Sequence, residues 1–177
     1  MVCARAAIIA CTMAFEIRNA NASDVPLIHQ FIRDLADYEK LGHVVVATEA
    51  QLRATLFGST PYAEVIIAEE DGKAAGFALF FHNYSTFLAQ RGVYLEDLFV
   101  RPSVRGKGLG KALLTWLAAE AVRRDCGRLE WSVLDWNEPS IQFYKSLGAK
   151  PMDEWTIFRL TGDALTALAG SPQSPGG

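Results

Sequence analysis

The stretch "RPSVRGKGLGKALLTWLAAEAVRR", residues 101–124, decides the fold. It places Gly106, Gly108 and Gly110 where an apolar run with helical spacing begins. Glycine inside a helix costs about 1 kcal/mol relative to alanine, so three glycines at a helix start point to a specific requirement. A helix N-terminus has free N–H groups and a partial positive charge, and glycines leave room there for a bulky anion. The stretch therefore favours a phosphate site, although the glycines alone are also compatible with a loop that binds nothing.

Two familiar phosphate-binding motifs do not fit this stretch. The Walker A motif needs four residues between its first glycine and G-K-[ST], but only three separate Gly106 from Gly110. Lys111 is also followed by Ala112, which has no hydroxyl for magnesium. The dinucleotide fingerprint G-x-G-x-x-G does not occur in this stretch, because its glycines form G-x-G-x-G. These two motifs are therefore excluded, and the stretch is either a phosphate site of another kind or a glycine-rich loop that binds nothing.

The order of the expected elements predicts one mixed α/β sheet. The strand 93–100, the helix 108–124 and the strand 128–134 form a crossover unit, whose two strands should be parallel. The first helix is expected to have Ser23 as its N-cap and Pro26 in its first turn. The remaining expectations are a strand at 15–20, a capping box at 48–51 opening a helix to 57, a hairpin turning at 71–72, a helix from Asn137 to Gly148, and a last strand at 154–160.

Composition narrows the class of protein. The chain has 177 residues, 50% of them apolar and 21% charged, with a net charge of −3, so it should be globular and lacks the basic surface that nucleic acid requires. No apolar run is long enough for a membrane span. Cys3, Cys11 and Cys126 form no zinc or disulfide pattern, which favours a reducing cytoplasm. We expect a loose extension at 1–13, with Met1 or Met13 as the start, a domain at 14–169 and a disordered tail at 170–177.

The glycine stretch also carries a family resemblance. "RGKGLG" fits R-x-x-G-x-G and resembles the pyrophosphate loop of the GCN5-related N-acetyltransferase (GNAT) superfamily. "YLEDLFVRPSVRGKGLGKALL" (94–114) and "DWNEPSIQFYKSLGA" (135–149) resemble the diamine (spermidine/spermine) acetyltransferases and their thialysine-acetylating relatives. "DLADYE" (34–39) and "YST" (84–86) fit the same group, and the resemblance extends from Phe15 to Leu168.

The resemblance implies the fold and the cofactor. A mostly antiparallel sheet flanked by helices would be splayed into a V-shaped cleft that holds acetyl-CoA, and the protein would be a homodimer. Pantetheine would lie along the backbone of Leu98, Phe99 and Val100. Asn137 would contact the cofactor arm, and Tyr144 matches the family's catalytic tyrosine. The pyrophosphate would bind to Arg105, Gly106, Lys107, Gly108, Leu109, Gly110 and Lys111.

Acetyl transfer to an amine poses two proton problems. A lysine-like amine with a pKa near 10.4 needs a base before it can attack. Glu96 is the first candidate and Asp97 the second; strand alternation places them on opposite faces, and the resemblance favours Glu96. Tyr144 would protonate the departing thiolate, and a strand N–H near Leu98 or Phe99 would hold the oxyanion. Asn137 and Tyr144 are seven residues apart on one helix, so they face the same way.

The acceptor is expected to be a small primary amine. By resemblance, Tyr38 and Glu39 join Glu96 and Asp97 in lining its site, and Asp153 or Glu154 could match another acidic position. The loop "NYSTFLAQRG" (83–92) lacks the aspartate that polyamine enzymes can carry, which favours a smaller, thialysine-like amine. The three histidines show no metal-ligand spacing, so no metal is expected. Two alternatives stay open: acetylation of protein lysines or N-termini, and a CoA-binding sensor without turnover.

Overall fold

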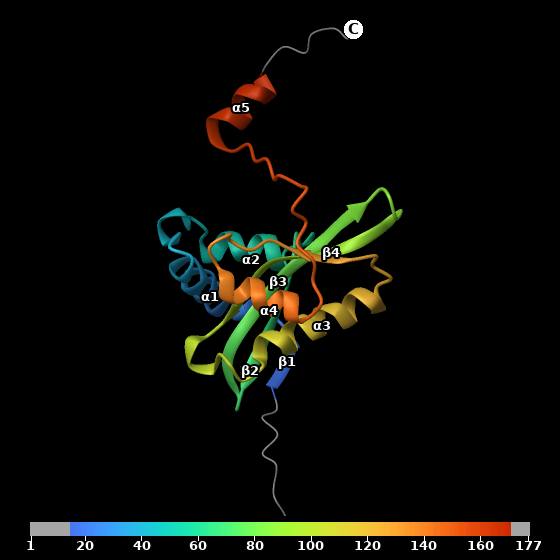
Figure 1. Cartoon of the computed structure of the whole chain (residues 1–177). Helices are drawn as coiled ribbons and strands as arrows, with labels where there is room; N and C mark the ends of the chain where they lie inside the picture. The colour runs from blue at the N-terminus through green and yellow to red at the C-terminus, as the bar shows by residue number, and fades with distance from the viewer. Residues whose placement is uncertain (1–14, 171–177) are drawn as a thin grey trace, which may run out of the picture. The chain divides into compact units, whose positions relative to one another are not determined.

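The computed structural model describes residues 15–170, which form two compact units, one ending at Ser132 and the other beginning at Val133. The expected extension at 1–13 and nearly all of the expected tail lie outside the described residues. The first unit contains the sheet (Figure 1). Its elements in chain order are β1 (Phe15–Asn19), α1 (Val25–Tyr38), α2 (Glu49–Phe57), β2 (Glu64–Glu70), β3 (Lys73–Ser85), β4 (Gln90–Val100), α3 (Leu109–Arg123) and β5 (Leu129–Trp131).

The five strands form a mixed sheet in the order β1-β2-β3-β4-β5. Strands β1 to β4 are antiparallel to their neighbours, and β5 runs parallel to β4, as the crossover around α3 predicted. The β2–β3 hairpin turns at Asp71 and Gly72, whose φ angles of 52° and 72° suit the twist of a tight hairpin. The predicted mixed, mostly antiparallel sheet is confirmed.

Helices cover both faces of this sheet (Figure 1). On one face, the Phe31 ring of α1 stacks on Phe77 of β3 at 5.3 Å between ring centres. Phe80, three positions further along β3, meets Trp116 of α3 edge-on at 6.1 Å. Because side chains alternate along a strand, Phe77 and Phe80 lie on opposite faces. We call these the α1 face and the α3 face.

The helix starts follow the capping rules, with one correction. Ser23 does not cap the first helix; the Asn21 side chain instead accepts the Ser23 N–H at 2.9 Å, and a short 3-10 turn, Ala22–Asp24, leads into α1. An asparagine is at least as good a cap as a serine, and the cap therefore lies two residues earlier, at Asn21. At α2, Thr48 and Gln51 form the predicted capping box.

Strand β4 contains a β-bulge. Leu79 of β3 lies opposite Asp97, but the next residue, Phe80, lies opposite Leu95, so Glu96 is the extra residue on β4. A bulge changes which side chains face each side of a strand. Leu95 and Asp97, on either side of Glu96, therefore lie on opposite faces of the sheet, although they are two positions apart.

The second unit consists of helices and extended chain. Its helices are α4 (Glu138–Ser146) and α5 (Gly162–Gly170). Asn137 caps α4, and Gly148 ends it with φ of +89°, both as predicted. The predicted strand at 154–160 is wrong: no residue from 133 to 170 belongs to a strand, and Phe158 is 92% exposed. An alternating apolar pattern is not sufficient for a strand, which also needs a neighbour to complete its hydrogen bonds. For the same reason β5 is shorter than the predicted 128–134.

Candidate active site

The carboxyl half of β4 has one open edge. Strand β5 pairs with β4 only at Val93, Tyr94 and Leu95. The Val93 N–H donates toward β5, to the Arg128 carbonyl at 2.9 Å, and the Arg101 N–H donates toward β3, to the Ala75 carbonyl at 2.9 Å. The sheet is thus closed on both sides of β4 up to Leu95 and open on one side beyond it.

Alternation identifies the backbone groups on that open edge. The backbone N–H of Arg101 points toward β3, so the N–H of Phe99 does so too. The N–H groups of Leu98 and Val100 point away from β3. Of the three residues expected to meet pantetheine, Leu98 and Val100 therefore direct their N–H groups toward the edge that no described strand covers. Phe99 instead belongs to the core, where it is 4% exposed and its ring lies 6.0 Å from that of Phe31.

Three carboxylates gather on the α1 face beside this edge. Burial, followed by the charges of Glu96 and Glu39, raises the pKa of Asp97 to about 6 from an ordinary value of 3.8. Burial also raises the pKa of Glu39, which follows the last residue of α1. Removing a carboxylate from water and placing others nearby both favour the protonated form. The cluster can offset these costs by binding a cation.

The bulge corrects our expectation for Glu96 and Asp97. Strict alternation would have placed Asp97 on the α3 face with Leu95, and Glu96 on the α1 face. Because Glu96 is the extra residue, Asp97 lies on the α1 face with Leu79 and Phe99. Asp97 is half-buried and Glu96 is exposed. The register therefore places Asp97 on the α1 face, next in sequence to the exposed Glu96, whose charge contributes to the raised pKa of Asp97.

Arg105 connects the glycine loop to this carboxylate site. Its Nε donates to the Val100 carbonyl at 2.9 Å. Its guanidinium lies 4.6 Å from the centre of the Tyr38 ring and 5.7 Å from that of Phe99, which are cation–π distances. The side chain that we expected on the pyrophosphate thus packs between β4 and α1, and it brings Tyr38 to the same place.

The glycine loop presents backbone rather than side chains. Gly106 and Gly108 have φ angles of +77° and +95°, where other residues are strained, and a Cβ on either would meet no atom within 4 Å. Gly108 is the N-cap of α3, and no side chain caps the helix there. The first intrahelical bond is the Ala112 N–H to the Gly108 carbonyl, which leaves the preceding N–H groups available. This cradle fits a diphosphate.

The two lysines of the loop differ in their partners. Lys107 binds both carboxylate oxygens of Glu70, at 2.9 and 3.1 Å. Lys111 is exposed and makes no ion pair with another described residue. Glu70 ends β2, and nothing in its sequence position indicated that it would neutralise a loop lysine. Lys111 is therefore the cation of the loop that can reach an anion without first losing a partner.

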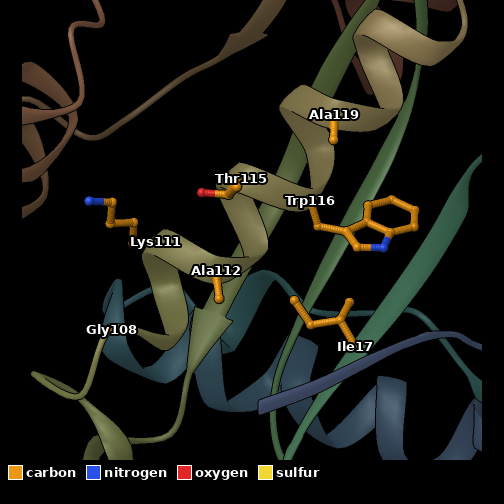
Figure 2. Close-up of a pocket in the computed structure, with 7 residues that line it drawn as sticks. All are labelled: Ile17, Gly108, Lys111, Ala112, Thr115, Trp116 and Ala119. Atoms are coloured by element: carbon orange, nitrogen blue, oxygen red, sulfur yellow. The ribbon is translucent and has the colours of Figure 1, made fainter. Parts of the chain in front are cut away.

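A separate groove of about 520 Å³ runs along α3 from Gly108 (Figure 2). Figure 2 shows Trp116 and Ala112 of α3 facing Ile17 of β1, with Lys111 at the end nearest the loop. The groove has no carboxylate in its lining, so it does not suit a cationic amine. The acceptor amine fits the α1-face carboxylates better.

The second unit holds the other two expected residues on one helix. The Asn137 side chain accepts the Ser140 N–H at 3.4 Å, which fixes the start of α4. Tyr144 lies near the end of the same helix, seven residues later. Among residues 15–170, no three His, Cys, Asp or Glu side chains, the α1-face carboxylates included, are arranged so that they could hold one metal ion. No described helix is both long enough and apolar enough to cross a bilayer.

Comparisons with known proteins identify the family. The acetyltransferase (GNAT) family model matches residues 28–149. The chain is 38% identical to the L-ornithine N5-acetyltransferase NATA1 of Arabidopsis thaliana, covering 88% of both proteins. It is 39% identical to the thialysine N-epsilon-acetyltransferase of Bos taurus, covering 89% of this chain and 99% of that protein.

Among solved structures, an integron cassette protein from the mobile metagenome of V. cholerae matches with a TM-score of 0.76 and 33% identity. That match covers 90% of this chain and 99% of the other. Together with the family match, it confirms the predicted α/β architecture. The chain belongs to the GNAT acetyltransferase family. It is an acetyl-CoA-dependent N-acetyltransferase, as two similar proteins named for N-acetyl transfer also indicate.

Proposed function

We propose that the enzyme acetylates the side-chain amine of a small amino acid of the ornithine or thialysine kind. The observation that carries this proposal is the carboxylate cluster of Glu39, Glu96 and Asp97, which lies on the α1 face of β4 where the open edge begins. A cationic amine relieves the repulsion among these carboxylates. Acidic groups also steer cations toward a site.

In the proposed complex, the N–H groups of the glycine loop and of the start of α3 bind the diphosphate of acetyl-CoA. The open N–H groups of Leu98 and Val100 face the pantetheine arm and the thioester. One of them holds the oxyanion when the amine attacks. This assignment replaces Phe99, which hydrogen bonds toward β3, with Val100.

The reaction proceeds by direct attack within a ternary complex. A carboxylate of the Glu96–Asp97 pair removes one proton from the ammonium group, and the amine nitrogen bonds to the thioester carbonyl carbon. The carbon–sulphur bond then breaks, and the Tyr144 hydroxyl protonates the departing thiolate. The second amine proton restores the tyrosine, so one proton is released for each amide formed. Asn137 is proposed to contact the cofactor arm.

Two relatives favour an amino acid over a polyamine. The similar proteins from Arabidopsis thaliana and Bos taurus are named for ornithine and for thialysine, which both carry a carboxylate besides their amines. The loop at 83–92 has Ser85 and Thr86 and no acidic residue, so it adds nothing to hold a long polycation.

The experiment is a panel of acceptors assayed by release of free thiol from acetyl-CoA. We expect thialysine and ornithine to give the highest kcat/KM, followed by lysine, with putrescine, spermidine and a histone-like peptide lower. The highest rate on the peptide would favour a protein acetyltransferase. Thiol release no faster with any acceptor than in its absence would contradict the proposal and favour a CoA sensor.

Two further parts of the proposal come from the family resemblance and the cysteine content: a homodimer and a cytoplasmic location. Cys126, the free cysteine of the described residues, is half-buried. Light scattering at several protein concentrations tests the dimer. A mass that stays at one chain up to working concentration would contradict it.

A further inference from the structure

The bulge in β4 gives two neighbouring carboxylates different surroundings, and we infer that Asp97, rather than Glu96, accepts the proton of the substrate amine. The inference rests on the proposed function, because it identifies the base of that same site. Glu96 then contributes its charge to binding the cation.

Asp97 is better placed than Glu96 to act as the base. The bulge places Asp97 opposite Leu79, on the α1 face and next to the core residue Phe99. Asp97 is half-buried there, whereas Glu96 is exposed to water. A base that is partly withdrawn from water holds a fixed position and competes less with solvent for the proton. The exposed Glu96 lacks both properties.

The charges around Asp97 favour its binding of a proton. Glu96 from the same strand and Glu39 from the end of α1 both act on it. Two cations lie on this side: the Arg105 guanidinium stacks on the Tyr38 ring of the same helix, and the Arg101 guanidinium lies 5.1 Å from the centre of the Phe31 ring. Leu79, opposite on β3, carries no charge. Both guanidinium groups stack on aromatic rings, and the charges that act on Asp97 are those of Glu96 and Glu39, so its surroundings attract a proton.

The proton affinity of Asp97 suits a general base near neutral pH. Burial and the neighbouring carboxylates raise the pKa of Asp97 to about 6. A carboxyl group with this pKa is ionised at neutral pH and is a stronger base than an ordinary carboxylate, which suits general base catalysis near pH 7. The proton moves from the ammonium nitrogen to the Asp97 carboxylate and then to solvent after the amide forms, so the aspartate is restored in each cycle.

The test is the pH dependence of kcat/KM with thialysine. For the wild type, kcat/KM should fall as the pH drops through about 6, because Asp97 becomes protonated. Asp97→Asn should lose at least about 100-fold in kcat and should no longer show this acid limb. Glu96→Gln and Glu39→Gln should each move the limb to lower pH, because each removes a negative neighbour. Glu16→Gln, an exposed carboxylate of β1, is the matched control and should leave the limb unchanged.

A second readout does not depend on activity. A raised pKa in the folded state means that the folded protein binds more protons than the unfolded chain between about pH 4 and 6, so ionised Asp97 destabilises the fold above that range. Asp97→Asn should therefore have a higher Tm than the wild type at pH 8, and the difference should disappear near pH 4. No rise in Tm at pH 8 would contradict the burial on which the inference depends.

The acceptor panel tests the proposed function, and the variants test which carboxylate is the base. If the wild type acetylates no amine of the panel, the proposed function fails and the inference fails with it. If the wild type is active, but Glu96→Gln abolishes the acid limb and Asp97→Asn retains it, the proposed function stands and the base is Glu96. A limb that disappears only in Asp97→Asn supports the inference.

Discussion

The two halves of β4 have the same neighbour on one side and different surroundings on the other. From Gln90 to Leu95 the strand pairs with β3, and the residues from Val93 to Leu95 also pair with β5. Leu95 is 2% exposed. From Glu96 to Val100 it pairs with β3 alone, and Asp97 is half-buried. The closed half supplies stability, and the open half contains the unpaired backbone edge and the carboxylates to which the proposed function assigns the chemistry. A strand can serve both purposes because the bulge separates them.

The largest effect should come from the closed half. Leu95→Ala removes a buried side chain next to the core of the α3 face and should lower the free energy of unfolding by about 2–4 kcal/mol. Leu98→Ala, at the half-buried position beyond the bulge, should cost roughly half as much or less. Urea unfolding measures both. Equal losses would contradict the division of β4 into a stabilising half and a functional half.

The glycine loop offers the sharpest test of cofactor binding. Gly108→Val puts a branched side chain at φ of +95° in the phosphate cradle, and acetyl-CoA affinity should fall about 100- to 1,000-fold, as measured by calorimetry. The control is Gly72→Val, with φ of +72° and equally open space around its Cβ. Both variants should lose similar stability from backbone strain, about 1–3 kcal/mol. Unchanged affinity in Gly108→Val would place the diphosphate elsewhere.

The carboxylates of the open half need a separate proton donor for the thiolate, which is the role proposed for Tyr144. Tyr144→Phe should lower kcat about 100-fold and leave acetyl-CoA affinity nearly unchanged, because it removes the proton for the thiolate but not the binding groups. The control lies in the closed half: Tyr94→Phe removes a hydroxyl that bonds Ser132 at 2.8 Å and should leave kcat near its original value. Full turnover by Tyr144→Phe would remove the tyrosine from its proposed role.

The smallest effect concerns the link between loop and strand. Arg105→Lys keeps the charge but loses the planar group that stacks on Tyr38 while it bonds the Val100 carbonyl, and KM for acetyl-CoA should rise about tenfold. Arg91→Lys, in the closed half, is the matched control and should leave KM within about twofold. Steady-state kinetics with acetyl-CoA varied measures both. Equal KM values in the two variants would mean that the Arg105 link does not order the loop.

The sequence predicted the elements whose signals are local. Thr48 and Gln51 cap α2, Asn137 and Gly148 bound α4, and the glycine loop opens α3 as expected. Each of these depends on hydrogen bonds between residues a few positions apart. The family resemblance brought Tyr38, Glu39, Glu96 and Asp97 into one hypothesis, and the structure places these four residues around one part of β4.

What the sequence missed depends on partners far along the chain. The strand expected at 154–160 has the right alternation, but no ladder partner exists for it among residues 15–170. The bulge at Glu96 follows from the register against β3, which single-strand alternation cannot show. The pairing of Lys107 with Glu70 joins residues 37 positions apart, and no local pattern announces it.

The extra residue at position 96 also affects how this strand can change in length. Without Glu96, Leu95 would be followed directly by Asp97, and the register against β3 would continue without a break. Asp97 and Phe99 would stay on the face of Phe31, and Leu98 would stay on the face of Leu95, because the bulge already places two residues of β4 where one would suffice. A deletion at position 96 should consequently keep every other side chain of β4 on its present face, and it would remove a carboxylate without exchanging the two walls of the cleft.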